Sequence, residues 1–318
     1  MAGGDLRGQL VVLVGGSGFF GAHLAQELLS RGARLRIASR RPERAFRLKP
    51  LADLGQVQFA RADVTRPETV ERVLAGADAV VNLVGAFAGD LDAVQGAGAG
   101  RIAAAAKAAG AGAFVHVSAI GADARGTTAY ARSKAAGEAA VLAAFPSATV
   151  LRPSVLFGPD DGFVNLFARL IADPLPVLPV FGPEAAFQPL FVDDAAAAVA
   201  AALVDPARHG GKVFEIGGPE VVTMLALNRR IAAAQGRSRL FVPLPDAVSG
   251  GIALATGWLP FAPLSRDQWA LLKAGNVASG KLPGLKALGV RPRPLALFLE
   301  RWMVRYRKHG RFGMKASA

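Results

Sequence analysis

Tyr130 and Lys134 are the pair of side chains in this sequence best suited to acid–base chemistry. They stand four positions apart in Tyr-Ala-Arg-Ser-Lys, a spacing that places both on one face of a helix. A free tyrosine has a pKa of about 10, and a nearby ammonium group favours its phenolate. The pair predicts proton exchange with an alcohol or a carbonyl, and Ser118 is the candidate hydroxyl for orienting that group. The spacing is also common in ordinary helices, where packing and a surface charge explain it.

A glycine-rich turn near the start of the chain predicts a phosphate-binding loop. It reads Gly15-Gly16-Ser17-Gly18-Phe19-Phe20-Gly21 and follows a short apolar run. In such a turn the first glycine permits the tight bend, the next lets the backbone approach a pyrophosphate, and the last lets the helix pack on the strand. The helix that begins here also offers free N–H groups and the positive end of its dipole to the phosphates. The strand, turn and helix together predict dinucleotide binding rather than a purely structural turn.

The residues after the second expected strand indicate which dinucleotide is bound. A site that prefers NAD places a carboxylate about 20 residues beyond the glycines, against the ribose 2′-hydroxyl. No Asp or Glu lies between Glu27 and Glu43, and Ser39, Arg40 and Arg41 occupy that position instead. Because guanidinium groups suit phosphate oxygens, the sequence favours NADP(H) over NAD(H). The alternative is that the two arginines are only solvated.

Asp63 and Val64 end the third expected strand and are candidates for contact with the adenine. The following Thr65-Arg66-Pro67-Glu68 predicts a helix start with Thr65 as the N-cap. With that cap supplied by Thr65, we expect the Asp63 carboxylate to be free for the cofactor.

These groups require a parallel sheet to position them. Short apolar runs alternate with alanine-rich stretches of helical composition, which predicts an α/β fold with a Rossmann-type doubly wound parallel sheet and a smaller C-terminal lobe. The expected strands are 9–14, 34–38, 57–61, 79–84, 113–117 and 148–152, and the expected helices are 20–30, 67–74, 91–109 and 130–144. Prolines are frequent after Pro153, which is typical of loops in a substrate or interaction lobe. We expect an NADP-binding domain over 1–152 and a lobe over 153–318 that returns elements to the sheet.

Composition excludes several other classes of protein. The 318 residues are 52% hydrophobic and 19% charged, which excludes a disordered chain. There is no cysteine, and the four histidines (His23, His116, His209, His309) lack ligand spacing, so no metal site is expected. No apolar run reaches the roughly 18 residues of a membrane span, and residues 1–8 do not resemble a secretory signal. The alanine-rich run 195–204 predicts a buried helix.

Taken together, these motifs resemble the extended short-chain dehydrogenases. Within that superfamily the segments 82–85, 130–138, 152–159 and 188–194, with Ser265-Arg266-Asp267-Gln268, are similar to the dehydrogenase-like accessory subunit of respiratory complex I and its bacterial relatives. The resemblance implies an NADPH-binding protein without established turnover. It also places cofactor contacts at strand ends, and we expect these at Leu83, Val84, Gly85, Val117, Pro153, Ser154 and Val155, besides Tyr130 and Lys134.

The catalytic hydroxyl remains open at this stage. Many extended dehydrogenases carry a run of serines after strand five, and aligned in that way Ala119 and Ile120 replace the hydroxyl positions. Aligned by its distance from Tyr130, Ser118 supplies the hydroxyl instead.

The C-terminal segment adds a basic, amphipathic pattern. From Lys273 to Ala318 the chain carries eleven Lys or Arg against one acid, Glu300, and a second basic cluster spans 31–49. One helical stripe holds Leu295, Phe298, Leu299, Trp302 and Tyr306, with Arg301, Arg305 and Lys308 along its flank. Such a stripe suits a membrane surface or a partner groove, or else an ordinary helix docked on the protein's own core.

Two hypotheses follow from the sequence. The first is a non-catalytic NADPH-binding accessory or assembly subunit, cytoplasmic and peripheral to the inner membrane, whose partners are complex I subunits or the membrane surface. The second is an active NAD(P)-dependent oxidoreductase or epimerase acting on a hydrophobic carbonyl or alcohol. Nucleic-acid binding is not expected, because the basic tail contains no recognised module.

Overall fold

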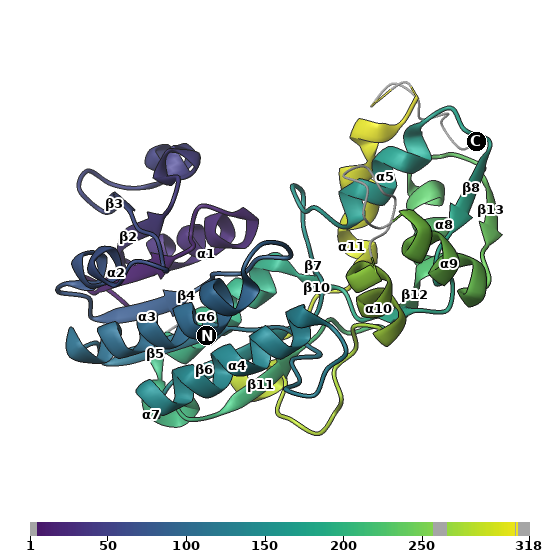
Figure 1. Ribbon diagram of the computed structural model, residues 1–318. Coiled ribbons are helices and arrows are strands. Elements are labelled where there is room, and N and C mark those ends of the chain that lie inside the picture. The colour runs from purple at the N-terminus through teal and green to yellow at the C-terminus, as the bar shows by residue number, and fades with distance from the viewer. Residues whose placement is uncertain (1–4, 257–265, 309, 311–318) are drawn as a thin grey trace. The chain divides into compact units, whose positions relative to one another are not determined.

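The computed structural model describes residues 5–256, 266–308 and 310 (Figure 1). The chain divides into two compact units, each assembled from separate stretches of sequence. Unit 1 consists of Met1–Pro153, Val192–Ile216 and Ala278–Arg291, and unit 2 consists of Ser154–Phe191, Gly217–Val277 and Pro292–Ala318.

Unit 1 is built on a seven-stranded sheet in which all paired strands are parallel, in the order β11-β6-β5-β4-β1-β2-β3. The strands are β1 (Leu10–Val14), β2 (Arg34–Ser39), β3 (Val57–Arg61), β4 (Ala79–Asn82), β5 (Ala113–Val117), β6 (Thr149–Pro153) and β11 (Val213–Ile216). Every residue of β1 is buried, as expected for a central strand covered on both faces. The predicted Rossmann-type doubly wound sheet is confirmed. β11 comes from beyond residue 153 and pairs with β6 in register Val213↔Val150.

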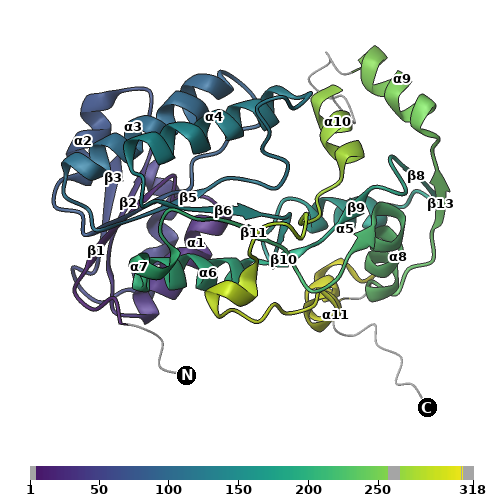
Figure 2. The same ribbon diagram turned by 90° about the horizontal axis from the view of Figure 1, so that it is seen from below.

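Helices cover both faces of this sheet. Figure 2 shows α2 (Pro67–Leu74), α3 (Ala97–Ala108) and α4 (Ala129–Ala144) on one face, and α1 (Phe19–Ser30) and α6 (Val192–Val204) on the other. The core under the first three is made of small and β-branched side chains such as Val70, Ile102 and Val141. The remaining helical segments of unit 1 are η1 (Pro42–Leu51), η2 (Asp92–Gly96), α7 (Pro206–His209) and η3 (Leu285–Leu288).

The helix expected over 91–109 is present, as a π-type turn, η2, that continues into α3. One local expectation was wrong. Thr65 does not cap α2; the cap position is Arg66 and has no side-chain hydrogen bond. The Thr65 hydroxyl instead donates to Asp63 Oδ1 at 2.7 Å, and the Thr65 N–H donates to the same oxygen at 3.0 Å. The Thr65 hydroxyl, which we expected to cap α2, therefore binds the carboxylate of Asp63, two residues beyond the end of β3.

Unit 2 contains short strands and amphipathic helices. Its strands are β7 (Leu156–Phe157), β8 (Val177–Val180), β9 (Ala186–Phe187), β10 (Leu190–Phe191), β12 (Val222–Thr223) and β13 (Leu240–Pro243). They form three two-stranded sheets: β7 with β10 and β8 with β13 are parallel, and β9 with β12 is antiparallel. Its helical segments are α5 (Val164–Ala172), α8 (Met224–Ala234), α9 (Asp246–Thr256), α10 (Arg266–Ala274), α11 (Ala296–Met303) and η4 (Val304–Tyr306).

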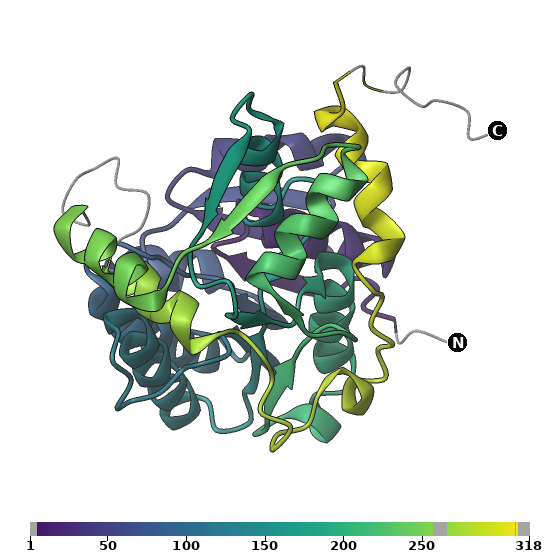
Figure 3. The same ribbon diagram turned by 90° about the vertical axis from the view of Figure 1, so that its right-hand side faces the viewer.

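The apolar stripe of the C-terminal segment is packed inside unit 2, with α11 beside α8 (Figure 3). Leu295 and Leu299 are buried, and the Phe298 ring stacks on Phe191 with centroids 4.1 Å apart. The Tyr306 hydroxyl donates to Asn165 Oδ1 at 2.8 Å. Of the alternatives that the sequence left open for this stripe, the structure favours a helix docked on the protein's own core, because Leu295, Phe298 and Leu299 pack within unit 2.

The basic flank of that stripe is partly used within unit 2 as well. Arg305 donates to the carbonyl oxygen of Pro159 and Arg307 to that of Ala234, whereas Arg301 and Lys308 are exposed. His309, residues 311–318 and Ser265 lie outside the described part of the chain. Within residues 5–256 and 266–308, none of the helices has both the length and the apolar character needed to span a bilayer.

Candidate functional site

The glycine loop follows β1 at the point where the strand order of the sheet reverses, since β1 lies between β2 and β4. Ligands of doubly wound sheets bind at the carboxyl ends of the strands at such a point. Gly15 has φ 84° and its missing Cβ would lie 3.0 Å from the Val84 nitrogen. A Cβ on Gly21 would lie 2.3 Å from the carbonyl oxygen of Gly16. Side chains at either position would disrupt the turn.

Gly18 differs from these two glycines because it faces open space. A Cβ on it would meet nothing within 4 Å, and it is the N-cap of α1 without a side-chain hydrogen bond. The first turn of α1 contains no acidic residue. The first N–H groups of a helix lack intrahelical partners. An exposed glycine, free amides and no opposing charge form a cradle that fits a pyrophosphate. Ser17, Phe19 and Phe20, the other expected residues of the loop, are half-buried around it.

The end of β2 provides groups that fit a 2′-phosphate. The Ser39 hydroxyl oxygen is buried and has no hydrogen-bond partner in the described part of the chain. Arg40 and Arg41, which follow it, are both exposed. Neither guanidinium forms a hydrogen bond or ion pair with any residue that the structure describes. A hydroxyl without a partner beside two uncommitted guanidinium groups fits a phosphate that bears two charges.

Asp63 is half-buried beyond the end of β3, and its pKa is lowered. The main causes are the hydrogen bonds from the Thr65 N–H and hydroxyl, and the charges of Arg40 and Arg66 add to them. Oδ1 accepts both bonds from Thr65 and is used within its own turn, and contact of Asp63 with the adenine stays a prediction. Val64 next to it is buried, and its carbonyl oxygen accepts a hydrogen bond from Arg101.

Lys134 lies where β4 and β5 end. Its side chain is buried, and Nζ lies 3.4 Å from the carbonyl oxygen of Val117 and 3.5 Å from that of Val84. Burial lowers the pKa of Lys134 to about 8, and the charge of Glu138 opposes this. α4 presents Lys134 because the Thr128 hydroxyl caps the helix by accepting from the Ala131 N–H at 3.1 Å. The ammonium group has three N–H donors, and the two carbonyl oxygens accept only two of them. The third N–H of Lys134 can therefore donate to a ribose hydroxyl.

Tyr130, one turn earlier on α4, lies under an aromatic ring. The ring of Phe87 stacks on it with centroids 4.8 Å apart and an interplanar angle of 11°. Lys134 Nζ is 6.0 Å from the centre of the Tyr130 ring. Burial raises the pKa of Tyr130 to about 12. The expectation that Lys134 favours the phenolate was therefore wrong for the protein without ligand, because burial has the larger effect.

Ser118 follows β5 and is buried, with 4% of its surface exposed. Its hydroxyl oxygen has no hydrogen-bond partner among the described residues. Two positions earlier, and therefore on the same face of β5, His116 is fully buried. Burial lowers the pKa of His116 to about 3, with Lys134 contributing, so its ring is neutral. A buried hydroxyl without a partner at the end of β5 has the character expected of a carbonyl-orienting group.

The other expected cofactor contacts divide between the two units. Leu83 and Val84 donate their N–H groups to the Val14 carbonyl oxygen and to Asn82 Oδ1, which fixes the chain next to the glycine loop. Gly85 is exposed, and Gly16, between Gly15 and Ser17, is buried. Pro153 ends β6, and its carbonyl oxygen accepts from the Ile120 N–H at 3.1 Å.

Ser154 and Val155 belong to unit 2, where their polar groups have partners. The Ser154 hydroxyl donates to the carbonyl oxygen of Gln188 at 2.6 Å, and the Val155 N–H donates to Asn276 Oδ1. Contact of these two residues with a cofactor stays a prediction.

Sequence reasoning missed two features of the site. Gln95 in η2 is buried, accepts from the Ala86 N–H at 3.1 Å and donates to the Ser133 hydroxyl at 2.8 Å, joining the loop after β4 to α4. A glutamine within an apolar helical stretch was the available signal. Phe87 was missed because a phenylalanine in a glycine-rich loop has no periodicity to place it.

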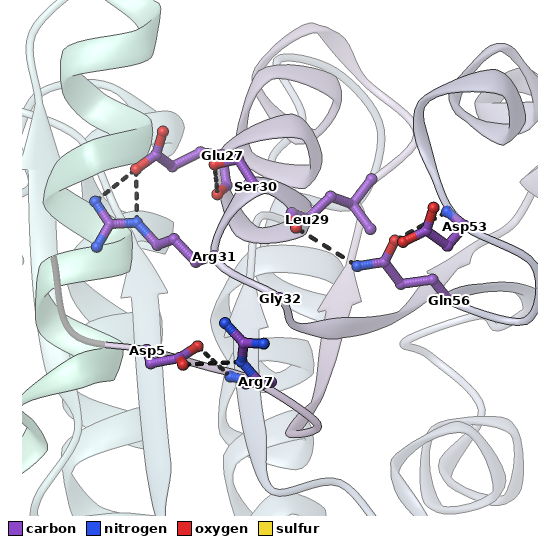
Figure 4. A pocket seen from close by; sticks show the side chains of 9 residues that line it. All are labelled: Asp5, Arg7, Glu27, Leu29, Ser30, Arg31, Gly32, Asp53 and Gln56. Carbon is purple, nitrogen blue, oxygen red and sulfur yellow. Dashed lines mark hydrogen bonds and ion pairs between the residues drawn. The ribbon is translucent and has the colours of Figure 1, made fainter.

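A hollow elsewhere in unit 1 does not belong to this site. It lies beside the segments that precede β1, β2 and β3, at the opposite end of these strands from the glycine loop (Figure 4). Its charged groups pair with each other, Arg31 with Glu27 at 2.6 Å and Arg7 with Asp5 at 3.0 Å. Among the residues that the structure describes, no group of three or more His, Asp or Glu side chains is arranged to hold a metal ion.

The glycine loop, Ser118, Tyr130 and Lys134 all lie in a stretch that matches a known family. The model of the NAD dependent epimerase/dehydratase family matches residues 11–217. The chain belongs to this family. It is therefore a nicotinamide-dinucleotide-binding protein, and the resemblance to extended short-chain dehydrogenases is confirmed.

Relatives extend the similarity beyond the family model. The chain is 32% identical to NADH dehydrogenase (ubiquinone) 1 alpha subcomplex subunit 9, mitochondrial, of Rattus norvegicus over 304 residues, which cover 92% of this chain and 79% of the relative. It is 33% identical over 264 residues to the ceramide reductase of Caulobacter vibrioides, with 80% of this chain and 79% of the relative covered. The crystal structure of Citrobacter sp. triphenylmethane reductase complexed with NADP(H) has the same fold, with a TM-score of 0.73, 19% identity, and coverage of 92% of this chain and 99% of that one.

Proposed function

We propose that the chain binds NADPH as a structural ligand and acts, without turnover, as an accessory or assembly subunit of respiratory complex I at the inner membrane. The observation that carries this is the 32% identity to a subunit of NADH dehydrogenase (ubiquinone), which extends over 92% of the chain and so includes the lobe as well as the cofactor domain. The described glycine loop and its open Gly18 support the cofactor. We further propose the cytoplasmic side of that membrane as its location.

NADPH rather than NADH is proposed because of the end of β2. Arg40 and Arg41 are exposed and uncommitted, and the Ser39 hydroxyl is buried without a partner. A carboxylate that would repel a 2′-phosphate is absent between Glu27 and Glu43. We also propose that residues 1–152 bind the cofactor and that residues 153–318 form the lobe that contacts a substrate or a partner.

A bound nucleotide regulates such a protein through its stability. A ligand that binds only the folded state stabilises it by RT ln(1 + [L]/Kd), about 4 kcal/mol at a thousandfold excess over Kd. Folding, and with it assembly, then follows the NADPH supply without any chemical step.

A second candidate is a reductase acting on a hydrophobic carbonyl. It is favoured by the 33% identity to a protein named ceramide reductase and by the buried Ser118 hydroxyl, which has no hydrogen-bond partner among the described residues. When bound, NADPH supplies a hydride. Tyr130 would donate the proton to the carbonyl oxygen, Ser118 would orient that oxygen, and Lys134 would hold the ribose.

Native purification from the host membrane separates the two candidates. We expect the chain to migrate with complex I subunits and to release NADP(H) on denaturation. Migration apart from complex I, together with NADPH oxidation by long-chain carbonyl compounds that is lost in Tyr130→Phe, would establish the reductase instead.

A further inference from the structure

The segment between β2 and β3 exposes cations and large apolar side chains together. Figure 1 shows it as the chain that leaves β2 and returns at β3, the edge strand of the sheet. We call the following residues the η1 patch: Arg44, Phe46, Arg47, Lys49, Leu51, Leu54 and Arg61. All of them are exposed, and the three apolar members have exposed fractions of 44% for Phe46, 52% for Leu51 and 107% for Leu54.

Ring and cation contacts join the η1 part of the patch to β3. The Phe46 ring meets the Phe59 ring of β3 edge-on, with centroids 5.1 Å apart. Lys49 Nζ lies 4.1 Å from the centre of the first ring and 5.9 Å from that of the second. Arg61 is two residues beyond Phe59 on β3 and so projects from the same face of the strand.

The fold does not need the outer side chains of this patch. Ala45 and Leu48 are the buried residues of η1 and dock it onto the unit. Leu54 stands fully in solvent, and Arg44, Arg47 and Lys49 form no ion pair with any described residue. Exposed leucine side chains next to unpaired cations are typical of a surface that binds a membrane or another protein.

We propose that the η1 patch docks the protein on an anionic lipid surface. Four cations, Arg44, Arg47, Lys49 and Arg61, complement the charge of acidic headgroups, and Glu43 and Asp53 are the only acids between residues 42 and 61. The apolar side chains are interspersed with the cations along the segment, so that on a bilayer they would enter the boundary of the acyl chains while the cations stay among the headgroups. A nucleic acid has the negative charge but no apolar layer that could bury Phe46, Leu51 and Leu54. An acidic protein surface would need a separate pocket for each of these side chains.

This proposal deepens the membrane location given in the proposed function by assigning it to one surface, and neither complex I nor turnover enters it. Arg40 and Arg41 are excluded from the η1 patch, so that cofactor binding and membrane binding can be changed separately. The C-terminal stripe is also excluded, because its apolar side chains are packed in unit 2.

The test is co-sedimentation of the full chain with vesicles of phosphatidylcholine alone or mixed with phosphatidylglycerol. Wild type is compared with Arg44→Gln/Arg47→Gln/Lys49→Gln and with a matched control, Arg72→Gln/Lys107→Gln/Arg125→Gln. The control removes the same charge from exposed positions of unit 1 outside the patch. The circular dichroism spectrum and the urea midpoint of every variant verify that it is folded.

We expect binding to the anionic vesicles only. Each patch cation contributes about fivefold to partitioning, so the patch variant should bind roughly a hundredfold more weakly and the control less than about threefold. Leu54→Ser should lose about tenfold at unchanged charge. Equal binding to both vesicle types, equal loss in the control, or no vesicle binding by a folded chain would overturn the proposal, and the last result would favour an acidic protein surface as the occupant.

Discussion

Phe87 covers the ring of Tyr130, and the two rings are nearly parallel, 4.8 Å apart at their centres. Burial raises the pKa of the phenol to about 12, and we expect this contact to contribute to that burial. The exposed fraction of Phe87 is 75%, so one face of its ring lies in solvent while the other face covers Tyr130. A tyrosine of ordinary pKa is already protonated at neutral pH, so the raised pKa mainly makes the phenolate of Tyr130 harder to form and disfavours it as a base.

Replacing this cover should make the phenol easier to ionise. In Phe87→Ala the pKa of Tyr130 should move from about 12 towards 10, because water reaches the ring. The chain has two tyrosines, so a spectrophotometric pH titration on a Tyr306→Phe background reports Tyr130 alone. Phe87→Leu should retain most of the shift. An unchanged titration in Phe87→Ala would show that the cover is not a cause.

Lys134 should lower the stability of the protein without ligand. The buried ammonium has its pKa lowered to about 8, against 10.5 for the ordinary side chain. The unfolded chain therefore binds more protons between these values, and the free energy of unfolding should rise with pH from about 8 to 10.5. Lys134→Met should be more stable than wild type at pH 7 by roughly 3 kcal/mol and should lose the rise.

The same variant should bind NADPH more weakly, whereas Tyr130→Phe should bind it almost as well as wild type. Urea unfolding at a series of pH values, with and without NADPH, measures both effects. A Lys134→Met protein that is less stable than wild type in the absence of cofactor, or Tyr130→Phe with an equal loss of affinity, would contradict these roles.

His116 should make the protein sensitive to acid. Asn82 Oδ1 accepts from the Val84 N–H, so Asn82 Nδ2 donates to His116 Nδ1 at 3.1 Å and the ring proton resides on Nε2. With the folded pKa lowered to about 3 and an unfolded value near 6.5, stability is lost as the pH falls below 6.5. The loss between pH 7 and pH 5 should be about 2 kcal/mol larger in wild type than in His116→Gln. Urea midpoints at the two pH values check the slope; parallel slopes would show that His116 does not cause it.

The sheet could be predicted from the sequence because its strands are continuous apolar runs separated by helical stretches. The glycine loop was placed correctly at the end of β1 for the same reason. Thr65 was assigned wrongly because its hydroxyl had two kinds of local partner, the Asp63 carboxylate as acceptor and the N–H donors of the first turn of α2, and spacing does not rank them. The stripe on α11 shows a second limit, since an amphipathic pattern identifies an apolar face but not what covers it. The contacts of Phe87 with Tyr130 and of Gln95 with the loop after β4 could not be predicted, because loop residues follow no sequence periodicity.

The choice between NADPH and NADH is the most direct test of the account. Isothermal titration of both nucleotides should show tighter binding of NADPH by wild type. In Arg40→Ala/Arg41→Ala the affinity for NADPH should fall about ten- to a hundredfold, the worth of one charge-assisted hydrogen bond or more, while that for NADH should change less than about threefold. Arg72→Ala/Arg125→Ala is the matched control, since it removes two exposed guanidinium groups elsewhere in unit 1. An NADPH/NADH affinity ratio that is the same in wild type and in Arg40→Ala/Arg41→Ala would contradict the account.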